Sequence, residues 1–137
     1  MVAPASRMSP EVAERVAALA ARRYPDRTPD IVFHPQCFAS HGHFAGDDDT
    51  RARAFLDVAN DDSFDAVWFA RGGYGSCRIA ETIMGALTES SRRKTYVGYS
   101  DAGMLLAALY RQGFKAVALE HDTPHLLAAV RELAGLL

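Results

Sequence analysis

The chain has 137 residues, a length that favours one compact domain with room for a substantial core. Apolar residues make up 49% of the sequence and charged residues 23%, which excludes a disordered or fibrous chain. The 15 basic and 17 acidic side chains nearly balance and form no dense Lys/Arg block, so we expect no nucleic-acid partner.

Short β-type apolar runs alternate with longer helical ones, which is typical of strand–helix–strand units around a parallel sheet. The expected strands are the end of a first strand at residues 1–4 and then residues 30–34, 65–70, 95–99 and 115–119. We therefore predict an α/β fold with a doubly wound parallel sheet of about five strands flanked by helices. A single domain is expected to cover residues 1–137.

The first helix is expected to begin after Ser9, a residue type that caps helices, with Pro10 at its first position. Its apolar residues recur at helical spacing and are expected to face the core: Val12, Val16, Leu19 and Ala20. Residues 35–46 lack a clear period and are expected to form a surface loop.

Three aspartates at residues 47–49 place negative charge where the N-terminus of a helix stabilises it. The helical stripes that follow along the chain comprise Ala52, Phe55, Leu56 and Ala59, then Ile79, Ile83, Met84 and Leu87, and then Met104, Leu105, Ala108 and Leu109. A last amphipathic helix at residues 123–136 is expected to close one face of the sheet.

Two side-chain groups suggest metal or thiol chemistry. His41 and His43 lie close to residues 47–49, but a solvated loop and a capped helix account for them, so we predict neither a metal site nor a cofactor. Cys37 and Cys77 have no zinc-site spacing and are expected to be reduced thiols. No apolar run approaches the roughly 20 residues of a membrane span, and no signal peptide is evident. We expect a cytoplasmic chain without a membrane partner.

Ser100 stands at an abrupt junction between a predicted strand and a predicted helix, at the sheet edge where parallel folds gather reactive groups. Gly98 and Ala102 flank it two residues away on either side. Small neighbours permit the tight bend of a nucleophilic serine, as in a G-x-S-x-G elbow, although alanine replaces the second glycine here. The alternative interpretation is that Ser100 or Asp101 only caps the following helix.

The glycine-rich turn, residues 71–78, follows the neighbouring predicted strand. Its glycines let backbone N–H groups approach a bound anion or a developing oxyanion. It is not a dinucleotide fingerprint, because Arg78 replaces the third glycine and Arg93 stands where an acidic residue belongs. A tight turn without chemistry is the alternative. Because consecutive parallel strands bring both loops to one edge, we expect this turn to lie close to Ser100.

In this order along the chain, several segments resemble the LD-carboxypeptidase family: residues 44–51, 60–62, 71–75 with Arg78, and 98–101. The opening at residues 2–6 also resembles the first strand of that family, and the resemblance covers about residues 2–117. It implies a serine peptidase that hydrolyses the amide between an L-centre and a terminal D-amino acid. The typical substrate is a murein tetrapeptide or a related peptide, from which terminal D-Ala is released during cell-wall recycling in the cytoplasm.

The same resemblance implies the roles of individual residues. Ser100 is the nucleophile, and the backbone N–H groups of Asp101 and Gly73 form the oxyanion hole. The substrate-binding residues that the resemblance implies are Arg71, Gly72 and Tyr74. The family takes its catalytic His and Glu from a second, C-terminal domain, which is absent from this chain, so the isolated chain is expected to be nearly inactive.

Three alternatives stay open from the sequence. His121 or His125, oriented by Glu120 or Asp122, could serve as the base, although residues 122–124 also suit a helix cap. A flavodoxin-like module could hold a small anion or nucleotide at residues 72–75 without catalysis. A scaffold could expose apolar surface where a domain is missing and associate as a homodimer.

Overall fold

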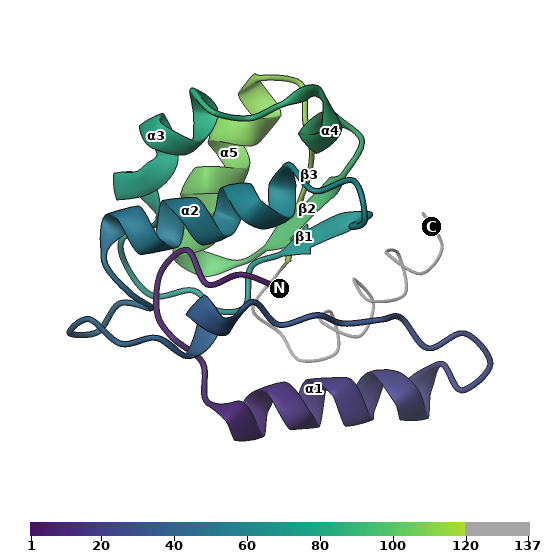
Figure 1. Cartoon of the computed structure of the whole chain (residues 1–137). Helices are drawn as coiled ribbons and strands as arrows, with labels where there is room; N and C mark the ends of the chain where they lie inside the picture. The colour runs from purple at the N-terminus through teal and green to yellow at the C-terminus, as the bar shows by residue number, and fades with distance from the viewer. Residues whose placement is uncertain (120–137) are drawn as a thin grey trace.

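The computed structural model describes residues 1–119 of the chain. At its centre is a parallel sheet in the order β1-β2-β3, formed by β1 (Ala66–Trp68), β2 (Thr95–Gly98) and β3 (Lys115–Ala118), as Figure 1 shows. Val67 pairs with Tyr96, and Tyr96 pairs with Ala116. The α/β class and the parallel sheet flanked by helices are confirmed.

The first two expected strands are extended segments rather than strands of the sheet. Val2 forms an isolated parallel bridge with Phe69, and the His34 N–H donates to the carbonyl of Met1 at 3.0 Å. Within residues 1–119 the sheet therefore has three strands, not about five. Pro4 ends the first segment and Pro35 follows the second, and neither proline has an N–H to continue a ladder.

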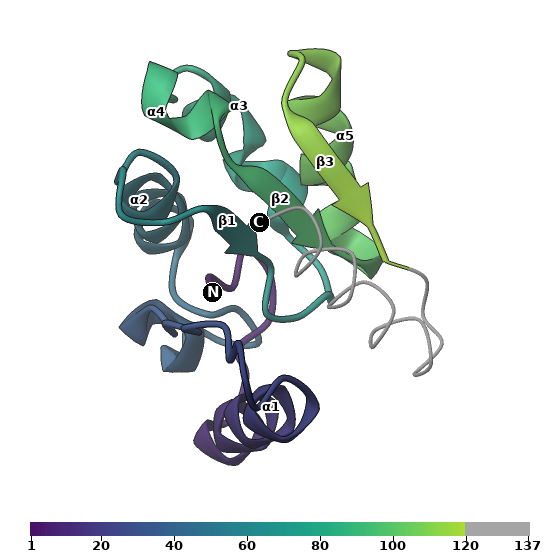
Figure 2. The same cartoon turned by 90° about the vertical axis from the view of Figure 1, so that its right-hand side faces the viewer.

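The helices are α1 (Pro10–Arg23), α2 (Asp48–Ala59), α3 (Ala80–Met84), α4 (Glu89–Arg92) and α5 (Gly103–Arg111), with 3₁₀ turns η1 (Pro35–Phe38), η2 (Ser76–Ile79) and η3 (Ser100–Ala102). Figures 1 and 2 show α1 on one side of β1, and α2, α3 and α5 on the other side. None of the helices in the described part is long and apolar enough to cross a membrane.

The main core lies between the sheet and the helices α2, α3 and α5. Phe55 of α2 packs against Phe69 and Tyr96, with ring centres 5.7 Å and 5.8 Å apart, and Phe114 meets Tyr96 edge-on. The predicted stripe of α2 is confirmed, since Ala52, Phe55 and Ala59 are buried and Leu56 packs against them. The aromatic cluster fixes the positions of β1 and β2, whose carboxyl ends carry the candidate site.

Two residues expected in the core are exposed instead. Val12 and Leu19 of α1 are 43% and 45% exposed, and Met104, which belongs to the predicted apolar stripe of α5, is 61% exposed. In α1 the small residues Ala13 and Ala20 are the ones buried, so the helix approaches the rest of the molecule along a narrow stripe. Val12 and Leu19 fall beside that stripe rather than on it.

Residues 35–46 are not simply a surface loop. Gln36 and Cys37 are buried in the 3₁₀ turn η1. The Gln36 side-chain amide donates to the carbonyl of Ala3 at 2.8 Å, and the Ala3 N–H donates back to Gln36 Oε1 at 3.1 Å. This side chain replaces the backbone ladder that a neighbouring strand would supply. His41 and His43, in the later part of the segment, are exposed.

Two of the predicted helix starts are confirmed. Ser9 occupies the N-cap position of α1 with Pro10 at the first helical position, although the Ser9 side chain makes no capping hydrogen bond. At α2 the carboxylate of Asp47 accepts a hydrogen bond from the Thr50 N–H at 2.8 Å. The helix predicted at residues 123–136 lies outside the described residues.

Candidate functional site

Ser100 lies at a sharp bend where the sheet ends. β2 stops at Gly98, and Ser100 has φ 55°, a left-handed conformation that no other non-glycine residue among residues 1–119 adopts. The side chain of Ser100 is exposed, and η3 leads directly into α5. A serine with this φ is strained, and such strain persists only where the surrounding structure imposes it.

The glycine turn reaches Ser100 through Gly72. A Cβ atom placed on Gly72 would lie 2.9 Å from Ser100 Oγ and 2.6 Å from Ser100 Cβ. Any side chain at position 72 would therefore collide with Ser100. The expectation that the turn and Ser100 lie side by side is confirmed.

Asp101 ties the two loops together. The Ser76 N–H donates to Asp101 Oδ2 at 2.9 Å, and the Ser76 hydroxyl donates to the Asp101 carbonyl at 2.6 Å. The interpretation that Ser100 or Asp101 caps the following helix is wrong, because no side chain caps η3 or α5. The carboxylate instead accepts the first N–H of η2, which begins at the end of the glycine turn.

The other glycines of the turn adopt conformations that disfavour side chains. Gly73 has φ 133°, and a Cβ atom there would lie 2.1 Å from Ser6 Oγ. Gly75 has φ 107°, and its Cβ atom would lie 2.7 Å from the Phe44 ring. The turn thus packs between the N-terminal segment and the loop before α2, and its backbone comes close to both.

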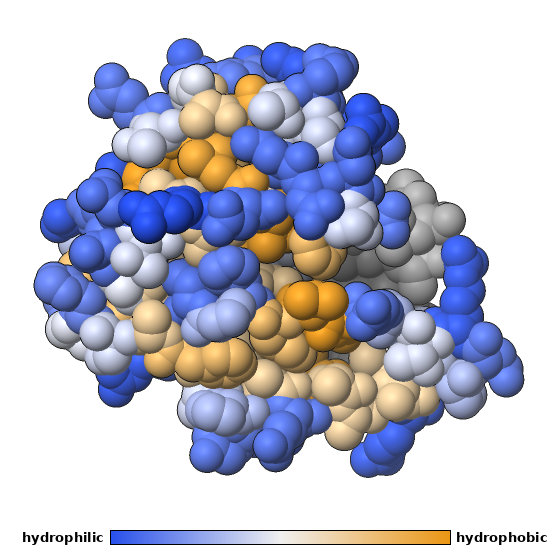
Figure 3. Space-filling model, viewed as in Figure 1, coloured by the Kyte–Doolittle hydropathy of each residue, from blue (hydrophilic) through white to orange (hydrophobic). Residues whose placement is uncertain are grey.

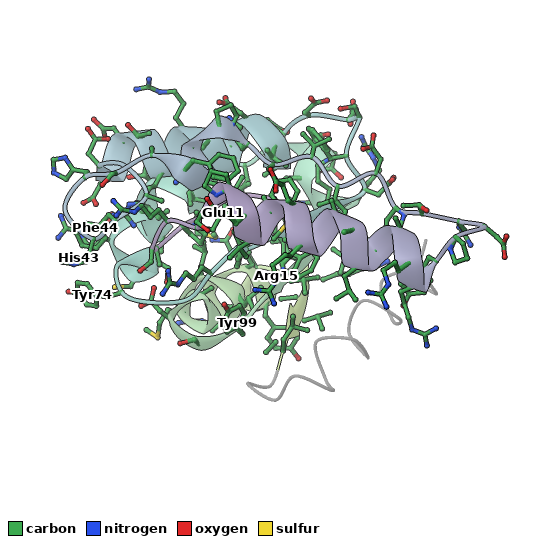
Figure 4. All side chains as sticks on the ribbon, turned by 90° about the horizontal axis from the view of Figure 1, so that it is seen from below. Glu11, Arg15, His43, Phe44, Tyr74 and Tyr99 are labelled. Carbon is green, nitrogen blue, oxygen red and sulfur yellow. The ribbon has the colours of Figure 1, made fainter. Side chains whose placement is uncertain are left out.

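Arg71 and Tyr74, two of the expected substrate-binding residues, are exposed at this edge. Arg71 Nη1 donates to the carbonyl of Arg7 at 3.2 Å, and Tyr74 is 59% exposed. The Tyr74 and Phe44 ring centres are 6.2 Å apart, and Figure 4 shows both residues with His43 at one end of the molecule. Arg71 and Tyr74 are accessible to a ligand that approaches the turn.

A charged cluster that the sequence prediction does not include lies behind the turn. Arg51 donates to the carbonyls of Pro4 and Gly75, the latter at 2.9 Å, and pairs with Asp48. Arg78 binds the same carboxylate at 2.7 Å, and these contacts, the Arg78 hydrogen bond first, hold the pKa of Asp48 below its usual range. Arg51 stands four residues before the buried Phe55, a helical spacing that could have indicated a buried cation.

Two histidines within residues 1–119 contact groups other than Ser100. His34 Nε2 lies 3.7 Å from Asp57, and His43 packs against the ring of Phe44. His121 and His125 lie outside the described residues. Within residues 1–119, no group of three or more His, Cys, Asp or Glu side chains is arranged to hold a metal ion.

The two cysteines differ in environment. Cys37 is buried, donates to the Met1 carbonyl at 3.4 Å, and has its pKa raised by burial to about 11. Cys77 is exposed within η2. Neither cysteine forms a disulfide among the described residues, and only Cys77 is open to solvent.

The chain is similar in part to several known proteins. The sequence profile of the LD-carboxypeptidase N-terminal domain matches residues 1–118. The murein tetrapeptide carboxypeptidase of Pseudomonas aeruginosa is 25% identical over 117 residues, covering 85% of this chain and 37% of the relative. A Bacillus subtilis protein named "Probable murein peptide carboxypeptidase" is 38% identical over 71 residues, covering 52% of this chain and 22% of its own length.

A solved structure supports the fold. The crystal structure of muramoyltetrapeptide carboxypeptidase from Oxalobacter formigenes aligns with a TM-score of 0.66 and 24% identity. The alignment covers 87% of this chain and 39% of that chain. This chain therefore spans less than two fifths of the length of each relative described here.

Proposed function

The chain belongs to the LD-carboxypeptidase family through its N-terminal domain, and on that premise we propose that it supplies the nucleophile of a serine peptidase. The observation that carries the proposal is the exposed, strained Ser100 at the end of β2, with the glycine turn against it. An exposed hydroxyl close to backbone N–H groups is the arrangement that acyl transfer needs.

In the proposed reaction, Ser100 Oγ attacks the carbonyl carbon of the L-centre next to the terminal D-amino acid. The carbonyl oxygen becomes an oxyanion, which accepts hydrogen bonds from the backbone N–H groups of Gly73 and Asp101. The C–N bond then breaks, the D-amino acid leaves with a proton as the free amine, and the peptide stays as an ester on Ser100. Water hydrolyses that ester and restores the hydroxyl.

A base must take the proton from Ser100 in the first step and return it to the leaving amine. By family resemblance, a His and a Glu from a second, C-terminal domain do this. The relatives are more than twice the length of the segment that matches this chain, which leaves room for such a domain. Residues 1–137 alone are therefore proposed to be nearly inactive, since a serine hydroxyl without a base is a weak nucleophile.

The proposed substrate is a murein tetrapeptide, from which the enzyme releases terminal D-Ala during cell-wall recycling in the cytoplasm. The names of the Pseudomonas aeruginosa and Oxalobacter formigenes proteins support this substrate class. Arg71, Gly72 and Tyr74 are proposed to contact the peptide, because they line the turn beside Ser100 and two of them are exposed.

A hybrid enzyme tests the proposal, in which residues 1–118 of this chain replace the N-terminal domain of the Pseudomonas aeruginosa relative. The hybrid enzyme is expected to release D-Ala from murein tetrapeptide and to lose this activity on Ser100→Ala. Undiminished turnover in Ser100→Ala would remove Ser100 from the mechanism. As a second measurement, tetrapeptide is added to the chain alone, and its binding is monitored through the backbone amide chemical shifts of Gly73 and Asp101.

Two other hypotheses are weaker on the same observations. An anion-binding module needs open N–H groups at the turn, yet the Ser76 N–H donates to the carboxylate of Asp101, whose charge repels an anion.

Self-association would use apolar surface. Figure 3 shows apolar residues gathered on the face between α1 and α2. Light scattering of the chain distinguishes a homodimer from a monomer, and nucleotide titration tests the module.

A further inference from the structure

Arg51 is a buried cation directly behind the glycine turn. Its side chain is 0% exposed, and its Nε has no hydrogen-bond partner among the described residues. Removing a guanidinium from water is unfavourable unless its N–H groups find acceptors. Three acceptors offset that penalty: the carbonyls of Pro4 and Gly75 and the carboxylate of Asp48. These acceptors belong to three separate segments of the chain.

We propose that Arg51 is a positioning residue, which fixes the glycine turn and thereby the Gly73 N–H relative to Ser100. The inference rests on the proposed function, because the position of that N–H matters only if an oxyanion forms there. Arg51 cannot touch a substrate itself, since its side chain has no exposed surface. It acts through the Gly75 carbonyl, two residues along the chain from Gly73.

The contacts around Gly75 leave the turn little room to move. Arg51 Nη1 binds the Gly75 carbonyl at 2.9 Å, and the Phe44 ring lies where a Gly75 side chain would be. The guanidinium carbons of Arg51 and Arg78 lie 4.7 Å and 5.5 Å from the centre of that same ring. The ring is thus held by two cations, and Gly75 is held between the ring and the hydrogen bond.

The rest of the turn is held from its other side. Ser76 is bound by Asp101, and Gly72 lies against Ser100. Between these anchors lie only Gly73 and Tyr74, so a shift of the Gly75 carbonyl is expected to be taken up there, including at Gly73, whose φ of 133° only glycine adopts readily. Loss of the Arg51 contact is therefore expected to displace the Gly73 N–H.

The geometry needs arginine rather than lysine. A guanidinium presents five N–H donors in a planar fork, whereas an ammonium is a compact point charge. Arg51 Nη1 donates to both carbonyls while Nη2 donates to the carboxylate of Asp48, so the fork divides the three contacts between two nitrogens. Arg51→Lys keeps the charge and is expected to lose part of this set of contacts.

Lys94 supplies a matched control, because it is also a buried cation that binds two backbone carbonyls. Lys94 Nζ donates to the backbone carbonyl of Asp61 at 2.6 Å and to that of Phe64 at 2.7 Å, and Lys94 is 2% exposed. Lys94 immediately precedes β2, whereas Ser100 follows the other end of that strand. Both cations stabilise the fold, but only Arg51 contacts the turn.

The test compares Arg51→Met and Arg51→Lys with Lys94→Met, using backbone amide chemical shifts of the chain. The Arg51 variants are expected to move the Gly72, Gly73 and Asp101 amide signals, and Lys94→Met to leave them in place. Asp48→Asn removes only one acceptor of Arg51 and is expected to move the same signals less. An unmoved Gly73 signal in Asp48→Asn and in every folded Arg51 variant would overturn the proposal, as would equal movement in Lys94→Met.

Kinetics of the hybrid enzyme add a readout that a purely structural role would not move. Arg51→Lys is expected to lower kcat about 10²-fold with KM nearly unchanged, because a small misplacement of a transition-state donor affects the rate rather than binding. A rise in KM alone would contradict positioning. Full turnover in Ser100→Ala would defeat the proposed function while leaving the amide shifts of the Arg51 variants as they are.

Discussion

Ser76 and Asp101 join the two loops of the candidate site through a pair of hydrogen bonds. The Ser76 hydroxyl donates to the Asp101 carbonyl at 2.6 Å, and the Ser76 N–H donates to the Asp101 carboxylate at 2.9 Å. One loop leaves β1 and the other leaves β2, so the pair fixes the distance between the glycine turn and Ser100. Both N–H groups proposed for the oxyanion hole lie on the connected segments.

Ser76→Ala is expected to weaken this connection. The variant removes the hydroxyl and should lower the free energy of unfolding by about 1 kcal/mol. Ser91→Ala is the matched control, since Ser91 is also fully buried and its hydroxyl donates to the Thr88 carbonyl. Chemical denaturation should show similar losses for both variants, but only Ser76→Ala should reduce turnover of the hybrid enzyme. Equal turnover in the two variants would contradict the account.

Gly73→Ala is expected to disrupt both folding and turnover. The added Cβ atom would lie 2.1 Å from Ser6 Oγ, at a φ of 133° that alanine does not readily adopt. Gly103→Ala is the control, because nothing lies within 4 Å of a Cβ atom there and its φ is −57°. Denaturation should show a loss for Gly73→Ala and a gain of about 0.4–1 kcal/mol for Gly103→Ala. A neutral Gly73→Ala would mean that the turn is not constrained.

Ser100→Gly is expected to stabilise the fold while abolishing activity. Glycine adopts a φ of 55° without the penalty that serine carries, so the free energy of unfolding should rise by about 1 kcal/mol. Ser100→Ala removes the same hydroxyl without relieving the backbone, and should not be stabilising. Thermal unfolding of the two variants separates the effects. If Ser100→Gly were no more stable than Ser100→Ala, the bend would not be strained.

The two cysteines are expected to differ in their reaction with a thiol reagent, and Cys37 is expected to make the free energy of unfolding fall at alkaline pH. At pH 8 a thiol reagent should modify exposed Cys77 in the folded chain, and Cys37 only after denaturation. Burial raises the pKa of Cys37 from 9.0 to about 11, so the folded state keeps its proton where the unfolded state loses it. The resulting stability is fully present below pH 9 and is lost as the pH rises towards 11.

Cys37→Ala should flatten that alkaline decline, which denaturation curves between pH 8 and 11 would measure. Some decline should remain, because burial also raises the pKa of Tyr96 to about 12. Rapid modification of Cys37 in the folded chain at pH 8 would show that the segment around η1 opens readily, contrary to its buried contacts.

Much of the central architecture is predictable from local pattern. The apolar runs that became β1, β2 and β3 and the stripe of α2 follow directly from period and burial. The pattern does not reveal that Gln36 would bind Ala3 with its side chain, because a side-chain amide that replaces a ladder has no periodic sequence signal. The apolar runs at residues 1–4 and 30–34 therefore predict strands, although neither segment joins the sheet as a strand.

The sequence predicts which loops form the candidate site, but not the contacts that hold those loops in place. The glycines and Ser100 stand at strand ends, so their meeting follows from parallel topology. The role of Asp101 does not, because sequence proximity favours a cap on its own helix whereas the carboxylate reaches Ser76 on the neighbouring loop. The sequence does not indicate the role of Arg51 either, because a charged residue at the start of a helix normally faces solvent.

The most direct test of the central claim is to trap the ester intermediate. The hybrid enzyme should be quenched with acid during turnover of murein tetrapeptide, digested, and searched by mass spectrometry for a peptide that carries the murein tripeptide acyl group. The account predicts the acyl group on Ser100 and its disappearance in Ser100→Ala. An acyl group on another residue during active turnover would contradict the account.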